Sequence, residues 1–309
     1  MGLFRSIKKR WRRLTAPPVG VIYMLHRCSP LNRDNLRWNE HLKVSPEFLA
    51  NFIREQRRTR DFISLDDVAE IAAAGKRPPR PFIVMTFDDG YRDNYEYALP
   101  IFTEARAPFA VYVANGFPRR AAFLWWYVLE DILLKNAQIT LSDGSAFTCS
   151  TKAEKEDLFL QLRARILSSA QENLSADFRA LFANYEFDAA EYAEKLCANW
   201  DEVVALSRSP YCTIGAHTLN HYALNRLTAD ALENEIIGSK NELEQKLGGG
   251  TIRHFAYPYG TPNEVSSREI DFVVQRTDFT TACYADGGEV KARHLRRPRE
   301  LPRVFLGEL

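Results

Sequence analysis

The sequence feature that most constrains the fold is a repeated alternation of short apolar runs with amphipathic segments. Continuous apolar runs at 19–25, 81–87, 108–114 and 211–217 have the length and β-branched content of buried parallel strands. Helical periodicity follows at about 46–58, 65–74, 94–105 and 228–247, and shorter apolar runs lie at 62–65, 254–260 and 279–285. Strands that alternate with helices predict a parallel sheet covered by helices, of the α/β class.

The segment from about 121 to 208 departs from this rhythm. Three helical patterns in it are joined by the polar stretch ITLSDGSAFTCST. We therefore expect one α/β barrel over residues 19–309, interrupted by a helical insertion at about 121–208. Trp125 and Trp126 begin the insertion, and on a helix adjacent side chains point about 100° apart. One indole is expected in the core, and the other is a candidate platform for a sugar ring.

Charge is distributed unevenly along the chain, although the formal net charge is only +1. Residues 1–13 carry a net +6 and residues 291–303 a net +5, so the rest of the chain carries −10. Residues 1–18 form a basic segment in which Leu3, Phe4, Ile7, Trp11 and Leu14 share one helical face. Such a segment predicts peripheral contact with anionic lipid through residues 3–14. No nucleic-acid-reading module is visible, so nucleic acid is not an expected partner.

Cysteine usage and the N-terminal pattern predict the compartment. The five cysteines (Cys28, Cys149, Cys197, Cys212 and Cys283) are scattered, odd in number and lack a CxxC pair. This pattern is typical of reduced thiols rather than of a disulfide framework. The first residues also lack the apolar core of a secretory signal. We therefore expect a bacterial cytoplasmic protein, with peripheral attachment to the inner face of the membrane.

Polar residues with metal-ligand chemistry cluster at three places. His217 and His221 stand four residues apart, a spacing that would let one helical turn aim both imidazoles at one point. Asp88 and Asp89 end a buried strand, where two adjacent carboxylates are costly unless a cation or a proton offsets their charge. Arg253 precedes another apolar run. Together these residues favour a hydrolytic metal site at the strand ends of a barrel.

The motifs TFDDGY (86–91), HTLNH (217–221) and RHFAYPYG (253–260) resemble, in order, those of the polysaccharide deacetylases. This is the NodB-homology or carbohydrate esterase 4 family, and the resemblance covers about 19–118 and 211–285. It implies a distorted (β/α) barrel of the NodB-homology type. It also implies hydrolysis of the N-acetyl group of an amino sugar, for cell-envelope glycan biosynthesis. The implied cofactor is a divalent metal, Zn²⁺ by preference, with Co²⁺, Ni²⁺ or Mn²⁺ as alternatives.

The resemblance also implies a role for each matching residue. Asp88 is the general base, and Asp89, His217 and His221 are the metal ligands. Arg253 matches the arginine that holds the base and keeps it ionised. The backbone N–H of Tyr259 matches the donor that stabilises the tetrahedral oxyanion.

Two histidines are candidates for the general acid. His26 ends the apolar run 19–25, and its surroundings resemble the YHR-type opening of a circularly permuted branch of the family, although Leu25 stands where that branch has tyrosine. His294 comes after the other motifs, in the basic stretch VKARHLRRPR, where no apolar strand presents it. We favour His26.

Other functions share parts of this pattern. An N-formyl group would need only a smaller acyl pocket than an N-acetyl group. A non-haem Fe(II) oxygenase also uses two histidines and one carboxylate, but it has no need of a charged base beside the metal. An inactive carbohydrate-binding homologue would not need both the ligands and the base. The expected substrate is an amino-sugar glycan or its lipid- or nucleotide-linked precursor.

Overall fold

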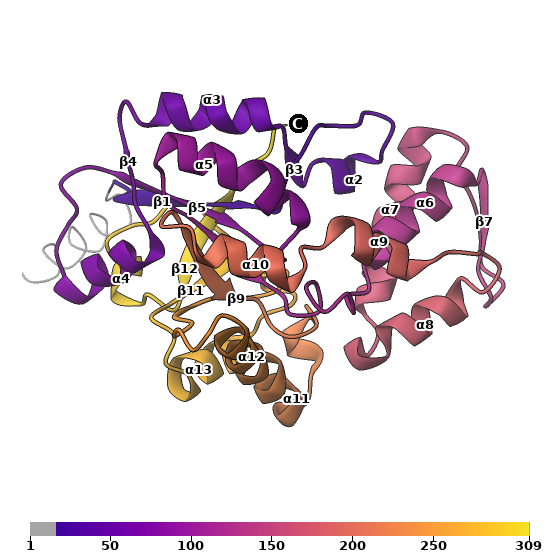
Figure 1. The fold of residues 1–309 in the computed structure, drawn as a ribbon. Coiled ribbons are helices and arrows are strands. Elements are labelled where there is room, and N and C mark those ends of the chain that lie inside the picture. Colours follow the sequence, from indigo (N-terminus) through magenta and orange to yellow (C-terminus); the bar gives the residue numbers. More distant parts are fainter. Residues whose placement is uncertain (1–16, 309) are drawn as a thin grey trace, which may run out of the picture.

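Seven parallel strands close into a barrel in the computed structural model, which describes residues 17–308 (Figure 1). Strand β1 (Gly20–Leu25) pairs on one side with β5 (Phe82–Phe87) and on the other with β12 (Leu301–Phe305), and these pairings close the ring. The remaining strands, in order from β5 to β12, are β6 (Phe109–Val113), β9 (Cys212–Ala216), β10 (His254–Ala256) and β11 (Thr281–Gly287). The expected α/β barrel is confirmed. The lipid-binding segment expected at 3–14 lies outside the described residues.

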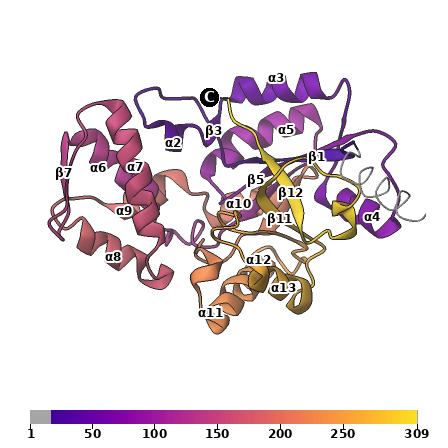
Figure 2. The ribbon, with the colours of Figure 1, turned by 180° about the vertical axis from the view of Figure 1, so that it is seen from behind.

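Helices surround the barrel on the outside (Figures 1 and 2). They are α3 (Pro46–Gln56), α4 (Leu65–Ala74), the π-turn η1 (Asn94–Ala98) with α5 (Leu99–Ala105), α10 (Trp200–Ser207), α11 (Ala229–Glu233) with η4 (Asn234–Gly238) and α12 (Ser239–Lys246), and α13 (Ser267–Arg276). Local chemistry sets their ends. Ser45 Oγ accepts from the Phe48 N–H at the start of α3, and Gly75 ends α4 at φ 61°.

Alternation along the strands separates two apolar layers. On β5, Phe82 and Val84 pack with the barrel interior, whereas Ile83, Met85 and Phe87 pack against the helices. The interior is crowded, because a Cβ added to Gly215 would lie 2.4 Å from the Tyr112 ring. A filled interior leaves the ends of the strands as the places where a site can form.

The insertion forms a lobe beside the barrel (Figure 1). It contains α6 (Trp125–Lys135), α7 (Lys152–Leu167), α8 (Leu174–Leu181) and α9 (Ala189–Leu196), which share an apolar core of their own. The polar stretch between α6 and α7 is an antiparallel hairpin of β7 (Gln138–Thr140) and β8 (Ala146–Thr148), which the sequence patterns did not predict. Helix α10 packs instead against β9 and η1 of the barrel.

A second connection leaves the barrel after β1. Residues of β2 (Arg27–Cys28) and β3 (Lys43–Val44) pair with each other, and the loop between them carries the short helix α2 (Arg37–Glu40). This 29–42 loop lies between the barrel and the insertion. No helix among residues 17–308 combines the length and apolar character needed to cross a membrane.

Candidate active site

Three predicted metal ligands meet at the carboxyl ends of the strands. Asp89 follows β5, and His217 follows β9. Asp89 Oδ1 lies 3.4 Å from His217 Nε2 and 3.2 Å from His221 Nε2, and one ligand atom from each residue lies within 4.8 Å of the others. Although buried, Asp89 Oδ1 accepts no hydrogen bond within 17–308. A buried carboxylate oxygen between two imidazole nitrogens, without hydrogen bonds, is the arrangement expected of a tetrahedral N/O metal site.

The two histidines converge through a loop rather than through a helix, so the expected helical turn at 217–221 is wrong. Thr218 has φ 70° and His221 has φ 58°, values that a right-handed helix cannot contain. The His221 N–H donates to Thr218 Oγ1 (3.1 Å), and the Asn220 amide donates to Glu235 on η4 (2.6 Å). These bonds hold an irregular backbone that the spacing alone did not reveal.

Hydrogen bonding fixes the ring of His217. Its Nδ1 lies 2.8 Å from the carbonyl oxygen of Ala256, at the end of β10. A carbonyl can only accept, so Nδ1 carries the proton and Nε2 presents its lone pair toward Asp89. A backbone acceptor behind a ligand imidazole is a frequent feature of metal centres.

A strained turn presents the two adjacent aspartates in different directions. Asp89 has φ 76° and the following Gly90 has φ 92°, and the Gly90 N–H donates to the Asp88 carbonyl (3.0 Å). Positive φ is uncommon outside glycine, and such strain is concentrated at functional sites. The turn lets Asp89 face the histidines while Asp88 faces the barrel interior.

Arg303, on β12, holds Asp88. Its Nη1 and Nη2 donate to the two carboxylate oxygens of Asp88 at 2.6 Å each, and its Nη1 also donates to Thr86 Oγ1 (3.1 Å). The Arg303 residue is 1% exposed. Burial alone would raise the pKa of Asp88, but the guanidinium outweighs it and holds that pKa below its ordinary value.

The expectation that Arg253 holds the base is wrong. Arg253 precedes β10 and so lies at the opposite end of the barrel from Asp88, where its side chain is half exposed and its Nη2 lies 2.8 Å from Asp66 Oδ1. Sequence reasoning did not single out Arg303, because it is one of six basic residues in the stretch 291–303. The signal that could have found it is an arginine inside the apolar run Leu301–Phe305, since a buried arginine needs a carboxylate partner.

His26 follows β1 and lines the same cavity as the two aspartates. Its buried Nδ1 has no hydrogen bond within the described chain. Burial lowers the pKa of His26, and the nearby charges of Asp89 and Asp88 oppose that shift. His294, in the short turn η5 (His294–Arg296), accepts from the Lys291 N–H and is not among the residues that line this cavity.

Tyr259 follows β10 and lines the same cavity. Its φ is 58°, and its ring centroid lies 4.8 Å from that of His221. No backbone hydrogen bond of residues 17–308 uses its N–H. This N–H is therefore a donor without a partner at the rim of the metal-ligand cluster.

The cavity measures about 410 Å³ and has walls from both lobes. The insertion supplies Trp125, which is buried, and Trp126, which is half-buried and has its ring centroid 6.0 Å from that of His221. The 29–42 loop supplies Trp38 and His41. Aromatic walls around a few polar groups are typical of small-molecule sites.

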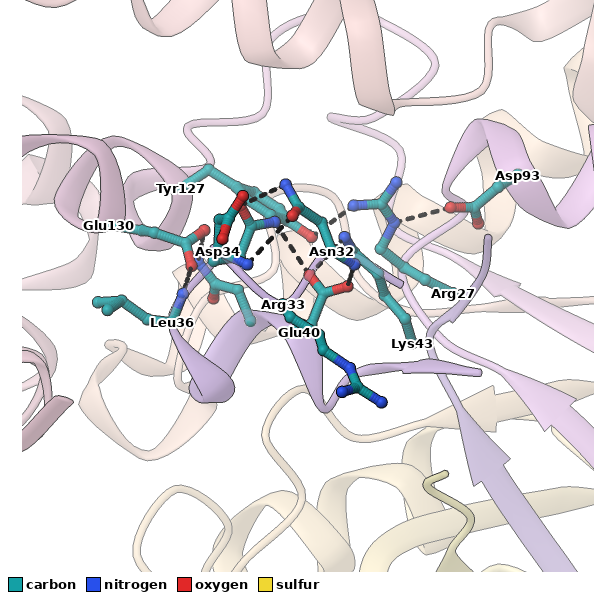
Figure 3. Close-up of polar contacts among 12 residues, drawn as sticks. Arg27, Asn32, Arg33, Asp34, Leu36, Glu40, Lys43, Asp93, Tyr127 and Glu130 are labelled. Carbon is teal, nitrogen blue, oxygen red and sulfur yellow. Dashed lines mark hydrogen bonds and ion pairs between the residues drawn. The ribbon is translucent and has the colours of Figure 1, made fainter. Parts of the chain in front are cut away.

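Buried polar contacts join the 29–42 loop to the insertion (Figure 3). Glu130 on α6 accepts from the Leu36 N–H (2.7 Å) and from the Asn39 side-chain amide (2.9 Å). Arg27 donates to Asp93 (2.7 Å) and to the Tyr127 hydroxyl (2.8 Å). These contacts fix the two cavity walls relative to each other.

A closed parallel barrel with its polar cluster at the carboxyl ends of the strands has the architecture of (β/α)-barrel enzymes. A family model described as polysaccharide deacetylase matches residues 75–139 and 171–280. The chain therefore belongs to the polysaccharide deacetylase family, and it is a carbohydrate deacetylase, a hydrolase. No curated protein matches the sequence.

Solved structures share the fold. The deacetylase PplD of Streptococcus pyogenes, in complex with acetate, is 16% identical, with 94% of each chain covered and a TM-score of 0.60. IcaB from Ammonifex degensii is 15% identical, with 94% of this chain and 93% of that chain covered and a TM-score of 0.58. The deacetylase domain of BpsB from Bordetella bronchiseptica is 15% identical, with 93% and 95% covered and a TM-score of 0.54.

Proposed function

We propose that this deacetylase is metal-dependent and removes the N-acetyl group of an amino sugar in a glycan precursor. The observation that carries the proposal is the Asp89–His217–His221 cluster directly beside the Asp88–Arg303 pair. Oxygen and imidazole nitrogen donors fit Zn²⁺, and they also fit Co²⁺, Ni²⁺ or Mn²⁺. A divalent cation held there would act as a Lewis acid, acidifying water and polarising the amide carbonyl.

The chain's own groups divide the remaining work. Asp88, kept ionised by Arg303, accepts the proton of the attacking water. The Tyr259 N–H donates to the carbonyl oxygen as negative charge develops on it. His26, which lines the same cavity, donates a proton to the departing amine, which is otherwise a poor leaving group.

The same residues serve an N-formyl group as well as an N-acetyl group. Family membership and the ionised Asp88 beside the cluster favour hydrolysis over an Fe(II) oxygenase. The carrier in this proposal is a lipid- or nucleotide-linked precursor.

The test combines substrate screening with metal analysis. Protein stripped with a chelator and reloaded with Zn²⁺, Co²⁺, Ni²⁺ or Mn²⁺ is incubated with free, nucleotide-linked and lipid-linked N-acetyl and N-formyl amino sugars. Mass spectrometry then detects loss of the acyl group. We expect turnover only after reloading. Turnover that survives complete stripping would overturn the metal dependence.

Two variants separate metal binding from proton transfer. His217→Ala should lose the metal by elemental analysis, because one of three ligands is removed. Asp88→Asn should retain stoichiometric metal but lose at least about 100-fold in kcat, the usual contribution of a positioned general base. Normal turnover of Asp88→Asn would contradict the assignment of the base.

A further inference from the structure

One charged side chain of the active-site cavity has no role in the chemistry described above. Arg163 lies on α7 of the insertion and lines the cavity together with the Asp88 and Asp89 carboxylates. Asp88 is neutralised by Arg303, and Asp89 belongs to the metal-ligand cluster. Arg163 therefore leaves a positive charge on the cavity wall that faces the site from the insertion.

Arg163 has no partner within residues 17–308. The guanidinium makes no hydrogen bond to the described chain and comes within 4.0 Å of no carboxylate there, although the residue is half-buried. Its charge does lower the pKa of Tyr259, against the larger effect of burial, so Arg163 lies near the oxyanion side of the cavity. A half-buried guanidinium without an anion has lost hydration without gaining a charged partner.

A second arginine shares the adjacent hollow. Arg163 lines both the active-site cavity and a second depression, which Arg226 also lines, and Arg226 is exposed. Glu264 lines the same depression, but its carboxylate accepts from Thr261 Oγ1 (2.5 Å) instead of pairing with either arginine. Two guanidinium groups that line one depression supply the charge and the hydrogen-bond donors that a phosphate or carboxylate group requires.

Most of the remaining lining of the cavity is apolar. Trp38, Trp126, Phe159 and Leu160 line it, and the Leu160 side chain is exposed at the rim. Such walls can pack against the faces of a sugar ring but contribute no charge. An uncharged N-acetylated sugar would leave Arg163 without a partner when it fills this cavity.

We infer that the substrate is an amino sugar that carries an anionic group, a phosphate or a carboxylate, next to the N-acyl residue, and that Arg163 binds this anion. The inference rests on the proposed deacetylation and specifies its substrate class. Arg163 acts by binding the substrate, and Arg226 extends the anion site toward the solvent.

Three model substrates test the inference. They are N-acetylglucosamine 1-phosphate, N-acetylmuramic acid and the neutral methyl N-acetylglucosaminide, each assayed with the metal-loaded protein. We expect kcat/KM for one of the anionic substrates to exceed that for the neutral one by about tenfold or more, the size of one charge-assisted hydrogen bond. The preferred anion distinguishes phosphate from carboxylate. Equal values for all three would overturn the inference.

The matched variants are Arg163→Gln, Arg163→Lys and Arg165→Gln. Arg165 lies on the same helix, but it is exposed and its guanidinium pairs with Asp143 (2.5 Å). Arg163→Gln should remove the preference for the anion, Arg163→Lys should keep most of it, and Arg165→Gln should leave it unchanged. An equal loss toward all three substrates in Arg163→Gln would also overturn the inference, since it would indicate a structural role.

Calorimetric titration gives a readout that needs no turnover. In the Asp88→Asn background, N-acetylglucosamine 1-phosphate and N-acetylmuramic acid should each bind the Arg163→Gln protein more weakly, the preferred anion by about tenfold. Arg163-dependent binding without hydrolysis of any substrate would contradict the proposed function and support the anion site. Hydrolysis of all three with no effect of Arg163 would contradict the anion site alone.

Discussion

At the scale of single residues, the site depends on which arginine reaches Asp88. The strand order of the closed barrel decides this, because β12 lies next to β1, and β1 pairs with β5. Arg303 thus enters the interior at the level of Thr86, below the turn that carries Asp88. A buried guanidinium of this kind is tolerated because each of its three nitrogens donates to an acceptor, with its Nε donating to the Tyr284 carbonyl (2.5 Å).

We expect Arg303→Lys to lower kcat/KM by about 100-fold, because a single ammonium cannot hold both carboxylate oxygens and the base loses its orientation. The acid limb of the pH–rate profile should also move to higher pH. Arg303 holds the pKa of Asp88 below its ordinary value, so a weaker partner lets the base become protonated earlier as the pH falls.

Arg253→Lys is the control for this prediction. The exposed pair of Arg253 with Asp66 should contribute about 0–1 kcal/mol to folding stability. Because Arg253 lies at the opposite end of the barrel from Asp88, activity should change by less than about twofold. The assignment fails if Arg253→Lys shifts the acid limb and Arg303→Lys does not.

The proton donor is tested at the same scale. His26→Asn should reduce kcat by about 10²–10⁴-fold, the range of general acid catalysis, whereas His294→Asn should leave kcat unchanged. The physical reason is position, because His26 lines the cavity and His294 caps a turn near the basic stretch. Steady-state kinetics of the two variants decide which histidine is the acid. A larger loss of kcat in His294→Asn than in His26→Asn would identify His294 as the acid.

At the scale of elements, the strands were easier to predict than the loops. Buried parallel strands are continuous apolar runs, so β1, β5, β6 and β9 could be identified from the sequence. Strand β12 was missed because Pro302 and Arg303 interrupt its apolar run. The metal ligands could be predicted from the spacing of the two histidines, from the aspartate pair at the end of a strand, and from the resemblance of both motifs to the family. The same spacing predicts a helical turn at 217–221, which is wrong because spacing does not report the positive φ of Thr218.

Helix α6 carries Glu130, whose carboxylate is buried against the 29–42 loop (Figure 3). Burial raises the pKa of Glu130 from 4.5 to about 7, and the Asn39 and Leu36 donors only partly offset it. The folded state therefore binds one more proton than the unfolded state between these pH values. The contribution of the protonated group to stability is complete below pH 4.5 and is lost as the pH rises through 7.

Glu130→Gln should remove this pH dependence. Relative to the native protein, the variant should gain on the order of 3 kcal/mol in unfolding free energy between pH 4.5 and 8, because an amide does not ionise. Urea denaturation at a series of pH values measures the difference. For Glu186→Gln, at an exposed position of the insertion, the difference in unfolding free energy from the native protein should not change with pH. A difference that does not change with pH for Glu130→Gln would contradict a buried titrating carboxylate.

At the scale of the whole molecule, the two basic ends of the chain are not equivalent. Within the C-terminal basic stretch, Arg303 is buried against Asp88, Arg299 donates to the Val274 carbonyl (2.6 Å) and Arg297 pairs with Glu300 (3.3 Å). These contacts account for three of the six basic residues of 291–303. We therefore expect attraction to an anionic surface to come mainly from residues 1–13, which carry a net charge of +6.

We expect the full chain to bind vesicles that contain anionic lipid and to lose this binding when residues 2–14 are deleted. Those residues include six Lys and Arg side chains and no acidic one, and each basic side chain near such a surface contributes about 1 kcal/mol. Co-sedimentation at low and high salt measures the effect, because screening weakens electrostatic attraction. The double variant Arg293→Gln, Arg296→Gln is the control and should bind nearly as well as the native chain. If the double variant is released and the deletion is not, the C-terminal stretch holds the protein on the lipid, and the amphipathic pattern at 3–14 has another purpose.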